Sequence, residues 1–180
     1  MARPSDTKIR IQATARELFR EQGVQNTSLK QISDRLGITK PALYYHFSSR
    51  EELVRSILQP VMDTLEAFVI GREPGEGRLL LEDYFDLIWR YREEISMVLH
   101  APTVLAELEM VDRMWRWRKE LTVLLLGPAP SDAARIRSTV ALGGMADCVV
   151  EHADLPAQEV KAAAVEAALA ALGPLGRATP

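Results

Sequence analysis

Apolar residues recur every three or four positions along most of the chain, and no run alternates at a period of two. Near the start, Ile11, Ala15, Leu18 and Phe19 occupy positions i, i+4, i+7 and i+8. This spacing places apolar side chains on one face of an α-helix, whereas a half-buried strand needs strict alternation. We therefore expect an all-α protein with about nine helices.

Capping residues divide the first fifty positions into three helices. Ser28 and Gln31 have the spacing of a capping box, which would open a second helix that ends at Gly37. Thr39 can cap the third helix, because its hydroxyl can accept a bond from a free amide of the first turn. Two short helices joined by so tight a turn have helix-turn-helix geometry, over about residues 28–47.

The third helix has two different faces at 100° per residue. Leu43 and Phe47 fall on the core side, and the opposite side is basic and aromatic, as suits a DNA major groove. Lys40 can donate to guanine or to a phosphate, and the tyrosine hydroxyls can reach phosphates. The predicted DNA-binding residues are Ser28, Lys30, Thr39, Lys40, Pro41, Ala42, Tyr44, Tyr45, His46 and Arg50.

Several of these residues have a second interpretation. The tyrosines could be core aromatics, but Leu43 and Phe47 already occupy the core side, so at least one tyrosine should face outward. His46 can pack against the first or fourth helix as readily as contact a phosphate. Thr39 is first a cap and only second a phosphate donor. Pro41 and Ala42 offer apolar contact to a thymine methyl.

Charge is distributed unevenly, although the net charge is only -3. Residues 1–55 carry ten Lys or Arg and six Asp or Glu, a balance of +4, whereas residues 56–180 carry twelve and nineteen, a balance of -7. This asymmetry indicates a polyanionic partner for the first part. No apolar run approaches the roughly 18 residues that span a bilayer. Asp6 and Lys8 interrupt the apolar core that a signal peptide would need. Cys148 is the single cysteine, so no disulfide can form within the chain. We expect a cytoplasmic protein without a membrane partner.

The same region resembles the TetR family of bacterial regulators in residues 11–19, 27–32, 36–47 and 50–53. The run of residues 44–47 followed by a basic residue at position 50 is the most specific part. The family usually has Lys where this chain has Arg50, a change that keeps the phosphate contact. The resemblance implies a homodimer, repression by occupation of a palindromic operator in double-stranded DNA, and release when a small molecule binds the C-terminal part.

The rest of the chain has helical patterns at about 49–68, 78–92, 93–100, 102–126, 131–152 and 156–172. The pattern at 49–68 contains Pro60, which predicts a bend. With the resemblance, these patterns divide the chain into a helix-turn-helix DNA-binding domain, residues 5–65, and a helical effector-binding and dimerisation domain, residues 66–180.

Aromatic residues and methionines in the second domain are typical of a small-molecule cavity. The predicted ligand-binding residues are Phe85, Trp89, Met97, His100, Met114 and Trp117, and the effector would be partly apolar. The same stripes are also typical of an ordinary core, and His100 near Pro102 can be a structural helix end.

Small residues are dense in the last two helical segments, at Gly143, Gly144 and seven alanines within 162–171. Glycine in a helix interior costs about 1 kcal/mol relative to alanine, a cost that close approach of a partner helix would offset. The two segments are therefore predicted to form the homodimer interface. A kink at the glycine pair is the other interpretation.

An enzyme is the weakest of the functions considered. His46, His100 and His152 are far apart in sequence, and no HExxH, GxSxG, Walker or CxxC pattern occurs. We expect no catalytic residue, metal or cofactor. The alternative to a ligand-responsive regulator is a DNA-binding dimer that responds to no ligand.

Overall fold

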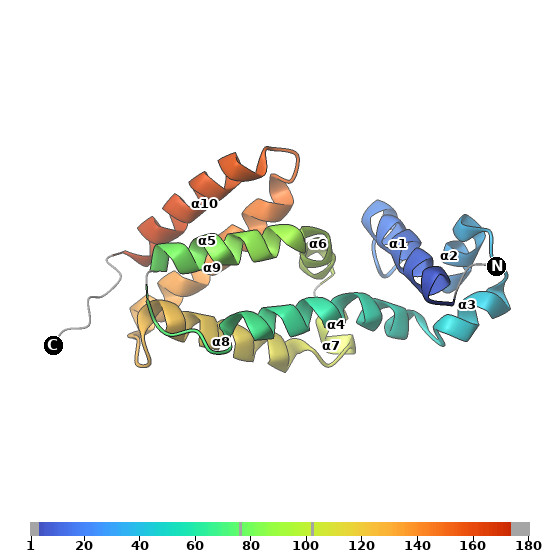
Figure 1. Ribbon diagram of the computed structural model, residues 1–180, viewed down its shortest axis with the longest axis horizontal. Helices are drawn as coiled ribbons and strands as arrows, with labels where there is room; N and C mark the ends of the chain where they lie inside the picture. The colour runs from blue at the N-terminus through green and yellow to red at the C-terminus, as the bar shows by residue number, and fades with distance from the viewer. Residues whose placement is uncertain (1–3, 76, 102, 174–180) are drawn as a thin grey trace. The chain divides into compact units, whose positions relative to one another are not determined.

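The computed structural model describes residues 4–75, 77–101 and 103–173, which form ten helices and no strand (Figure 1). The all-α prediction is confirmed. The chain forms two compact units: unit 1 comprises the described residues up to Met62 together with Ser96–Val111, and unit 2 comprises Asp63–Ile95 and the described residues from Asp112. The functional division into residues 5–65 and 66–180 stays a prediction.

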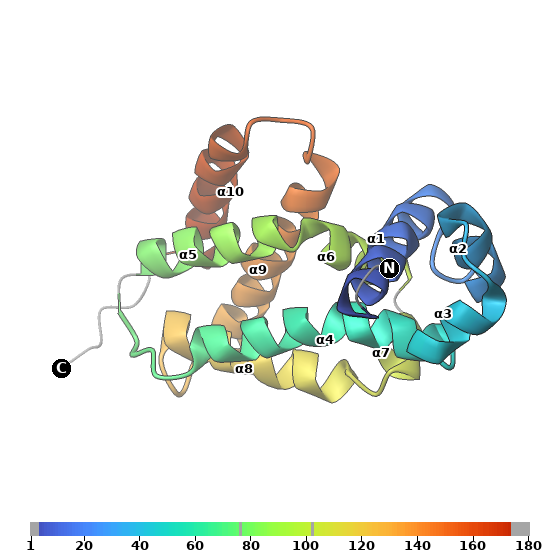
Figure 2. The same cartoon turned by 45° about the vertical axis from the view of Figure 1, so that its right-hand side comes forward.

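Unit 1 contains three helices that lie close together in Figures 1 and 2, and their buried apolar residues form its core. Ile11, Ile32 and Leu43 are fully buried and Phe47 nearly so. Full burial of such a side chain contributes about 1.5–3 kcal/mol, which matters because helices of seven or eight residues are unstable alone. These three helices are α1 (Pro4–Gln22), α2 (Leu29–Leu36) and α3 (Lys40–His46), and the first part of α4 (Arg50–Val69) also belongs to unit 1.

The turn between α2 and α3 is a Schellman motif. The amide of Gly37 donates to the carbonyl of Asp34 and the amide of Ile38 to that of Ser33, at 3.3 and 3.1 Å. Gly37 has φ +69°, a left-handed conformation that glycine adopts without steric cost. This turn reverses the chain tightly, so α3 begins three residues after Gly37.

The prediction of about nine helices is one short because the segment predicted as one helix at 102–126 is two. These are α7 (Thr103–Glu107) and α8 (Val111–Leu126). The break is a second Schellman motif: the amide of Glu109 donates to Ala106 and that of Met110 to Leu105, at 3.1 and 2.8 Å. Glu109 takes φ +57° at the position where glycine is usual, so the sequence carries no helix-ending signal there.

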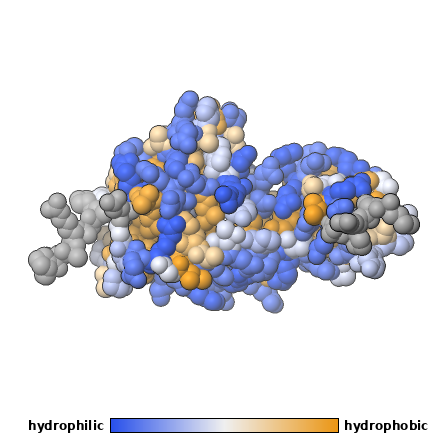
Figure 3. All heavy atoms as spheres, in the orientation of Figure 1, coloured by the Kyte–Doolittle hydropathy of each residue, from blue (hydrophilic) through white to orange (hydrophobic). Residues whose placement is uncertain are grey.

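Unit 2 consists of long helices, of which α9 and α10 pack against each other and both contact α5 (Figure 1). Hydrophobic side chains gather around α5 and α9 on the face drawn in Figure 3. Two helices are shared between the units: α4 continues from unit 1 into unit 2, and α6 continues from unit 2 into unit 1. The α4 helix contains Pro60 and remains one helix. The bounds are α5 (Gly77–Arg90), α6 (Arg92–His100), α9 (Asp132–Glu151) and α10 (Ala157–Leu172).

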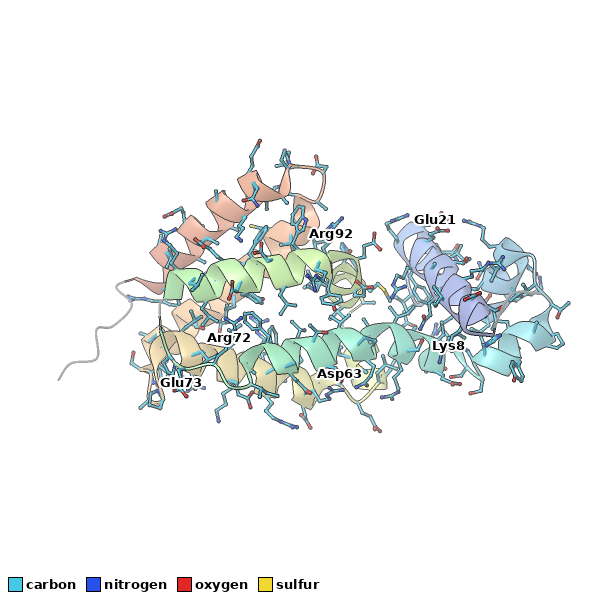
Figure 4. All side chains as sticks on the ribbon, viewed as in Figure 1. Lys8, Glu21, Asp63, Arg72, Glu73 and Arg92 are labelled. Atoms are coloured by element: carbon cyan, nitrogen blue, oxygen red, sulfur yellow. The ribbon has the colours of Figure 1, made fainter. Side chains whose placement is uncertain are left out.

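An ion-pair network joins α8 to the second part of α4 in unit 2. Arg113 donates through Nε and Nη2 to the two carboxylate oxygens of Glu66 and through Nη2 to Asp63, all at 2.8 Å. Asp63 is labelled in Figure 4. The hydrogen bonds from Arg113 lower the pKa of Glu66 and those carboxylates raise that of Arg113. The network therefore fixes the register of two neighbouring helices.

No helix formed by the described residues is both long enough and apolar enough to cross a bilayer.

Candidate nucleic-acid interface

The α3 helix divides into a buried side and an exposed side, as its sequence predicts. Leu43 and Phe47 are 0% and 1% exposed, whereas Tyr44 is 43% and Tyr45 80% exposed. Both tyrosines thus face outward, which excludes the interpretation that they are core residues. Lys40 at the first position of the helix is exposed too, with its ammonium 5.5 Å from the centre of the Tyr44 ring.

Capping fixes where this exposed side begins. The Thr39 hydroxyl accepts a hydrogen bond from the amide of Ala42 at 3.3 Å, so the predicted cap is confirmed. Pro41 and Ala42 are exposed beside Lys40 in the first turn. The exposed side therefore presents one ammonium, two small apolar side chains and two phenols, a chemistry that can meet base edges, thymine methyls and phosphates.

The start of α2 supplies a second part of the candidate interface. The capping box is confirmed: the Ser28 hydroxyl accepts from the amide of Gln31 at 3.3 Å, and the Gln31 side chain accepts from the Ser28 amide at 2.8 Å. Lys30 pairs with Asp34 at 2.7 Å, with both side chains more than half exposed. A phosphate would compete with water and Asp34 for this ammonium, and so exposed a pair is worth at most about 1 kcal/mol.

Arg50 and His46 are more constrained than their sequence positions suggest. Arg50 donates from Nη1 to the carbonyl of Gln25 at 3.2 Å and pairs with Glu51 at 3.3 Å, leaving its side chain 25% exposed. His46 is half-buried, and its ring stands edge-on to that of Tyr45, with centroids 5.2 Å apart. Both contacts support a structural role, and a phosphate contact by either residue stays a prediction.

Lys8 is a basic residue of this region that the sequence patterns did not single out. Its ammonium lies 5.4 Å from the centre of the Phe47 ring, at the end of α3 (Figure 4). Lys8 stands 32 positions before the start of α3, so no local periodicity connects it with that helix. It places an additional exposed cation beside the candidate interface.

The six predicted ligand-binding residues fall into the two units. Met97, which is buried, and His100, which is exposed, belong to unit 1. The Nδ1 atom of His100 lies 2.8 Å from the carbonyl oxygen of Ser96 one turn earlier, a structural helix-end contact. Neither observation tests ligand binding.

The other four, Phe85, Trp89, Met114 and Trp117, belong to unit 2. The Phe85 and Trp89 rings stack with centroids 5.5 Å apart on α5. Trp117 is buried, and the centroid of its ring lies 6.0 Å from that of Tyr84. Its indole N–H has no hydrogen-bond partner among the described residues.

Tyr84 on α5 is buried within unit 2. Its hydroxyl donates to the carbonyl of Leu142 on α9 at 3.3 Å, and burial raises its pKa to about 12. The hydroxyl therefore stays protonated and holds α5 to α9.

Comparison with known proteins agrees with this geometry. Residues 11–57 match the family model of bacterial regulatory proteins of the tetR family. The HTH-type transcriptional regulator UidR of Escherichia coli (strain K12) is 39% identical over 71 residues, which are 39% of this chain but only 35% of that protein. The sequence match thus spans about a third of the length of this relative.

Two solved structures share the fold over most of the chain. A transcriptional regulator of the TerR/AcrR family from Aquifex aeolicus VF5 has a TM-score of 0.72 at 23% identity, covering 89% of this chain and 96% of that one. A SmeT–triclosan complex has a TM-score of 0.59 at 22% identity, covering 97% and 98%. UidR and the Aquifex aeolicus protein are both described as transcriptional regulators. The helix-turn-helix of residues 28–47 lies within the matched segment, so this N-terminal part of the chain is similar to the TetR family of bacterial regulatory proteins.

Proposed function

We propose that the protein is a cytoplasmic transcriptional repressor that binds a palindromic operator as a homodimer and releases it when a small molecule binds. The exposed side of α3 carries this proposal. It places Lys40, Tyr44 and Tyr45 in solvent on a helix whose opposite side is fully buried. A short rigid helix of this kind can enter a major groove about 12 Å wide without rearrangement of the core.

Each exposed side chain has a role within this proposal. Lys40 donates to guanine O6 or N7, or to a phosphate, and Ala42 contacts a thymine methyl. The hydroxyls of Tyr44 and Tyr45 donate to phosphates on either side of the groove. The amides at the start of α2, with Ser28, hold a further phosphate at the positive end of the helix dipole.

The homodimer would form through α9 and α10. Val140 is 61% exposed on α9, and Gly144, one turn further along, is exposed with open space around the position of an added Cβ. No described residue comes close enough to require glycine at that position, so the small residue leaves room for a partner helix. Ala163, Ala167 and Ala170 are exposed on α10.

The effector would contact the aromatic residues of unit 2. The buried N–H of Trp117 lacks an acceptor among the described residues, and an unsatisfied buried donor costs about 1–3 kcal/mol. A ligand carrying a hydrogen-bond acceptor beside an apolar body would remove that cost. SmeT, which has the same fold, is described in complex with triclosan.

The test is a titration of operator DNA, first selected from genomic fragments, at several salt concentrations. Affinity should fall linearly on a log–log plot against salt, because each phosphate contact releases counterions. Lys40→Ala should weaken operator binding by about 1–3 kcal/mol and relax preference at one base pair, whereas Tyr44→Phe should weaken all sequences by about 1 kcal/mol.

Arg90→Ala is the matched control, since it removes an exposed cation from unit 2. Salt-independent affinity, or a half-site bound as tightly as the full palindrome, would contradict DNA binding by a dimer. An operator affinity that no metabolite extract changes would favour the ligand-independent dimer instead.

A further inference from the structure

A groove between α8 and α9 of unit 2 lies apart from the residues predicted to bind DNA or the effector. Its volume is about 530 Å³, within the roughly 300–1,000 Å³ typical of small-molecule sites. Its walls come from two helices of the same unit, α8 and α9. The DNA-binding residues and the six residues predicted to bind the effector are not among its lining residues.

The groove carries an excess of positive charge. Arg118 and Lys119 line it from α8 and Arg135 from α9, against one carboxylate, that of Asp132. Arg135 and Asp132 pair with each other at 3.2 Å. Among the described residues, the side chains of Arg118 and Lys119 have neither an ion-pair nor a hydrogen-bond partner, so two positive charges remain uncompensated.

Arg118 is the more constrained of these two cations. Its side chain is half-buried, and its Nη2 atom lies 3.8 Å from where a Cβ would stand on Gly143 of α9. The guanidinium therefore lies against the α9 backbone at the groove. A guanidinium held in this way presents a planar pair of donors, which matches the two oxygens of a carboxylate.

The rim of the groove is apolar on both sides. The indole of Trp115 on α8 is 57% exposed, and Ile136 on α9, which stands one turn before Val140 of the proposed dimer contact, is 65% exposed. Large exposed side chains of this kind gain free energy when a hydrocarbon group covers them, at about 25 cal/mol per Å² of apolar surface removed from water. The rim thus complements a hydrophobic body, and the cations complement an anionic group.

We propose that this groove binds an amphiphilic organic anion, namely a carboxylate attached to an aromatic or aliphatic body. The carboxylate pairs with Arg118 and Lys119, and the body packs between Trp115 and Ile136. This site goes beyond the proposed repressor function, because none of the residues predicted to contact the effector lines it.

The test measures binding of 2-naphthoate and of its neutral analogue 2-naphthalenemethanol to the full chain by isothermal titration calorimetry, without DNA. The wild type should bind the carboxylate at least tenfold more tightly. Arg118→Gln and Lys119→Gln should each weaken 2-naphthoate about three- to tenfold and leave the alcohol unchanged, because they remove only charge-assisted contacts. Trp115→Ala should weaken both compounds, because stacking does not depend on the charge of the ligand.

Arg116→Gln is the matched control, since Arg116 is exposed on the same helix and does not line the groove. Equal affinity for the two compounds, no binding of 2-naphthoate, or an equal effect of Arg116→Gln and Arg118→Gln would overturn the proposal. Lys119 is exposed, so its substitution reports on the site even if the Arg118 variant unfolds, and circular dichroism verifies the fold of each variant. Operator titration without any ligand is a separate measurement, so failure of either proposal is recognised independently.

Discussion

Replacement of Gly144 by leucine should affect the stability of the chain and its self-association in opposite directions. Gly144 lies in the interior of α9, where glycine costs about 1 kcal/mol relative to alanine and leucine is close to alanine. Apart from its chain neighbours and the nearby backbone of α9, a Cβ added there meets no atom of the described residues within 4 Å. Gly144→Leu should therefore raise the free energy of unfolding of the monomer by roughly 0.5–1 kcal/mol.

The same leucine should weaken the homodimer, because it would occupy space proposed for a partner helix. Steric mismatch in a packed contact costs about 1–3 kcal/mol, so the dimer dissociation constant should rise roughly 5- to 150-fold. Gly144→Ala is the matched control: it brings a similar gain in helix propensity and adds only a methyl group. Sedimentation equilibrium over a range of protein concentrations gives the dissociation constant, and urea unfolding of the dilute monomer gives the stability.

Two results would refute this reasoning. A Gly144→Leu protein that dimerises as tightly as the wild type would remove Gly144 from the interface. A monomer destabilised by the leucine would show that the chain itself requires glycine at this position.

Three further predictions concern single interactions. Ser28→Ala should lower the free energy of unfolding by about 1 kcal/mol, because the cap of α2 is lost. In thermal unfolding, the double variant Ser28→Ala with Gln31→Ala should lose less stability than the sum of the two single variants, because both hydrogen bonds belong to one capping box. Glu66→Gln should lower the melting temperature at pH 7. The hydrogen bond from Arg113 lowers the pKa of Glu66, so the contribution of Glu66 to stability is present above its unfolded pKa and is lost as the pH falls through its folded pKa. A difference in melting temperature that does not shrink as the pH falls would contradict this. Tyr84→Phe should cost about 1 kcal/mol and should remove the tyrosine that ionises near pH 12 in an alkaline absorbance titration; an unchanged titration would contradict its burial.

Local chemistry explains how much of the fold could be predicted from the sequence. The Ser28–Gln31 box and the Thr39 cap each depend on residues three positions apart, and Gly37 ends α2 by its own conformational preference. Such signals act within one turn of helix, so they can be read without knowing the tertiary structure. The predicted positions of α2 and α3 are confirmed for this reason.

The division between α7 and α8 could not be predicted because the residue that causes it carries no signal. Glu109 adopts the left-handed conformation at a cost of about 1 kcal/mol or more, whereas its intrinsic preference is for the helix. Burial of the next residue, Met110, which is 1% exposed, compensates for that cost. Tertiary packing thus overrides local propensity here, and only the folded chain reveals it.

The two candidate sites differ in predictability for a geometric reason. The DNA-binding side of α3 belongs to a single helix, so the 100° rotation per residue separates Lys40 and Tyr45 from the buried Leu43 directly from the sequence. The groove of unit 2 is lined by two helices. Arg118 and Ile136 meet at it because α8 packs beside α9, and the periodicity of neither helix predicts that packing. A cation on a helix surface is an ordinary solvated charge until a neighbouring helix supplies the opposite wall. A site on one helix can therefore be proposed from sequence, whereas a site between two helices becomes visible only in the folded chain.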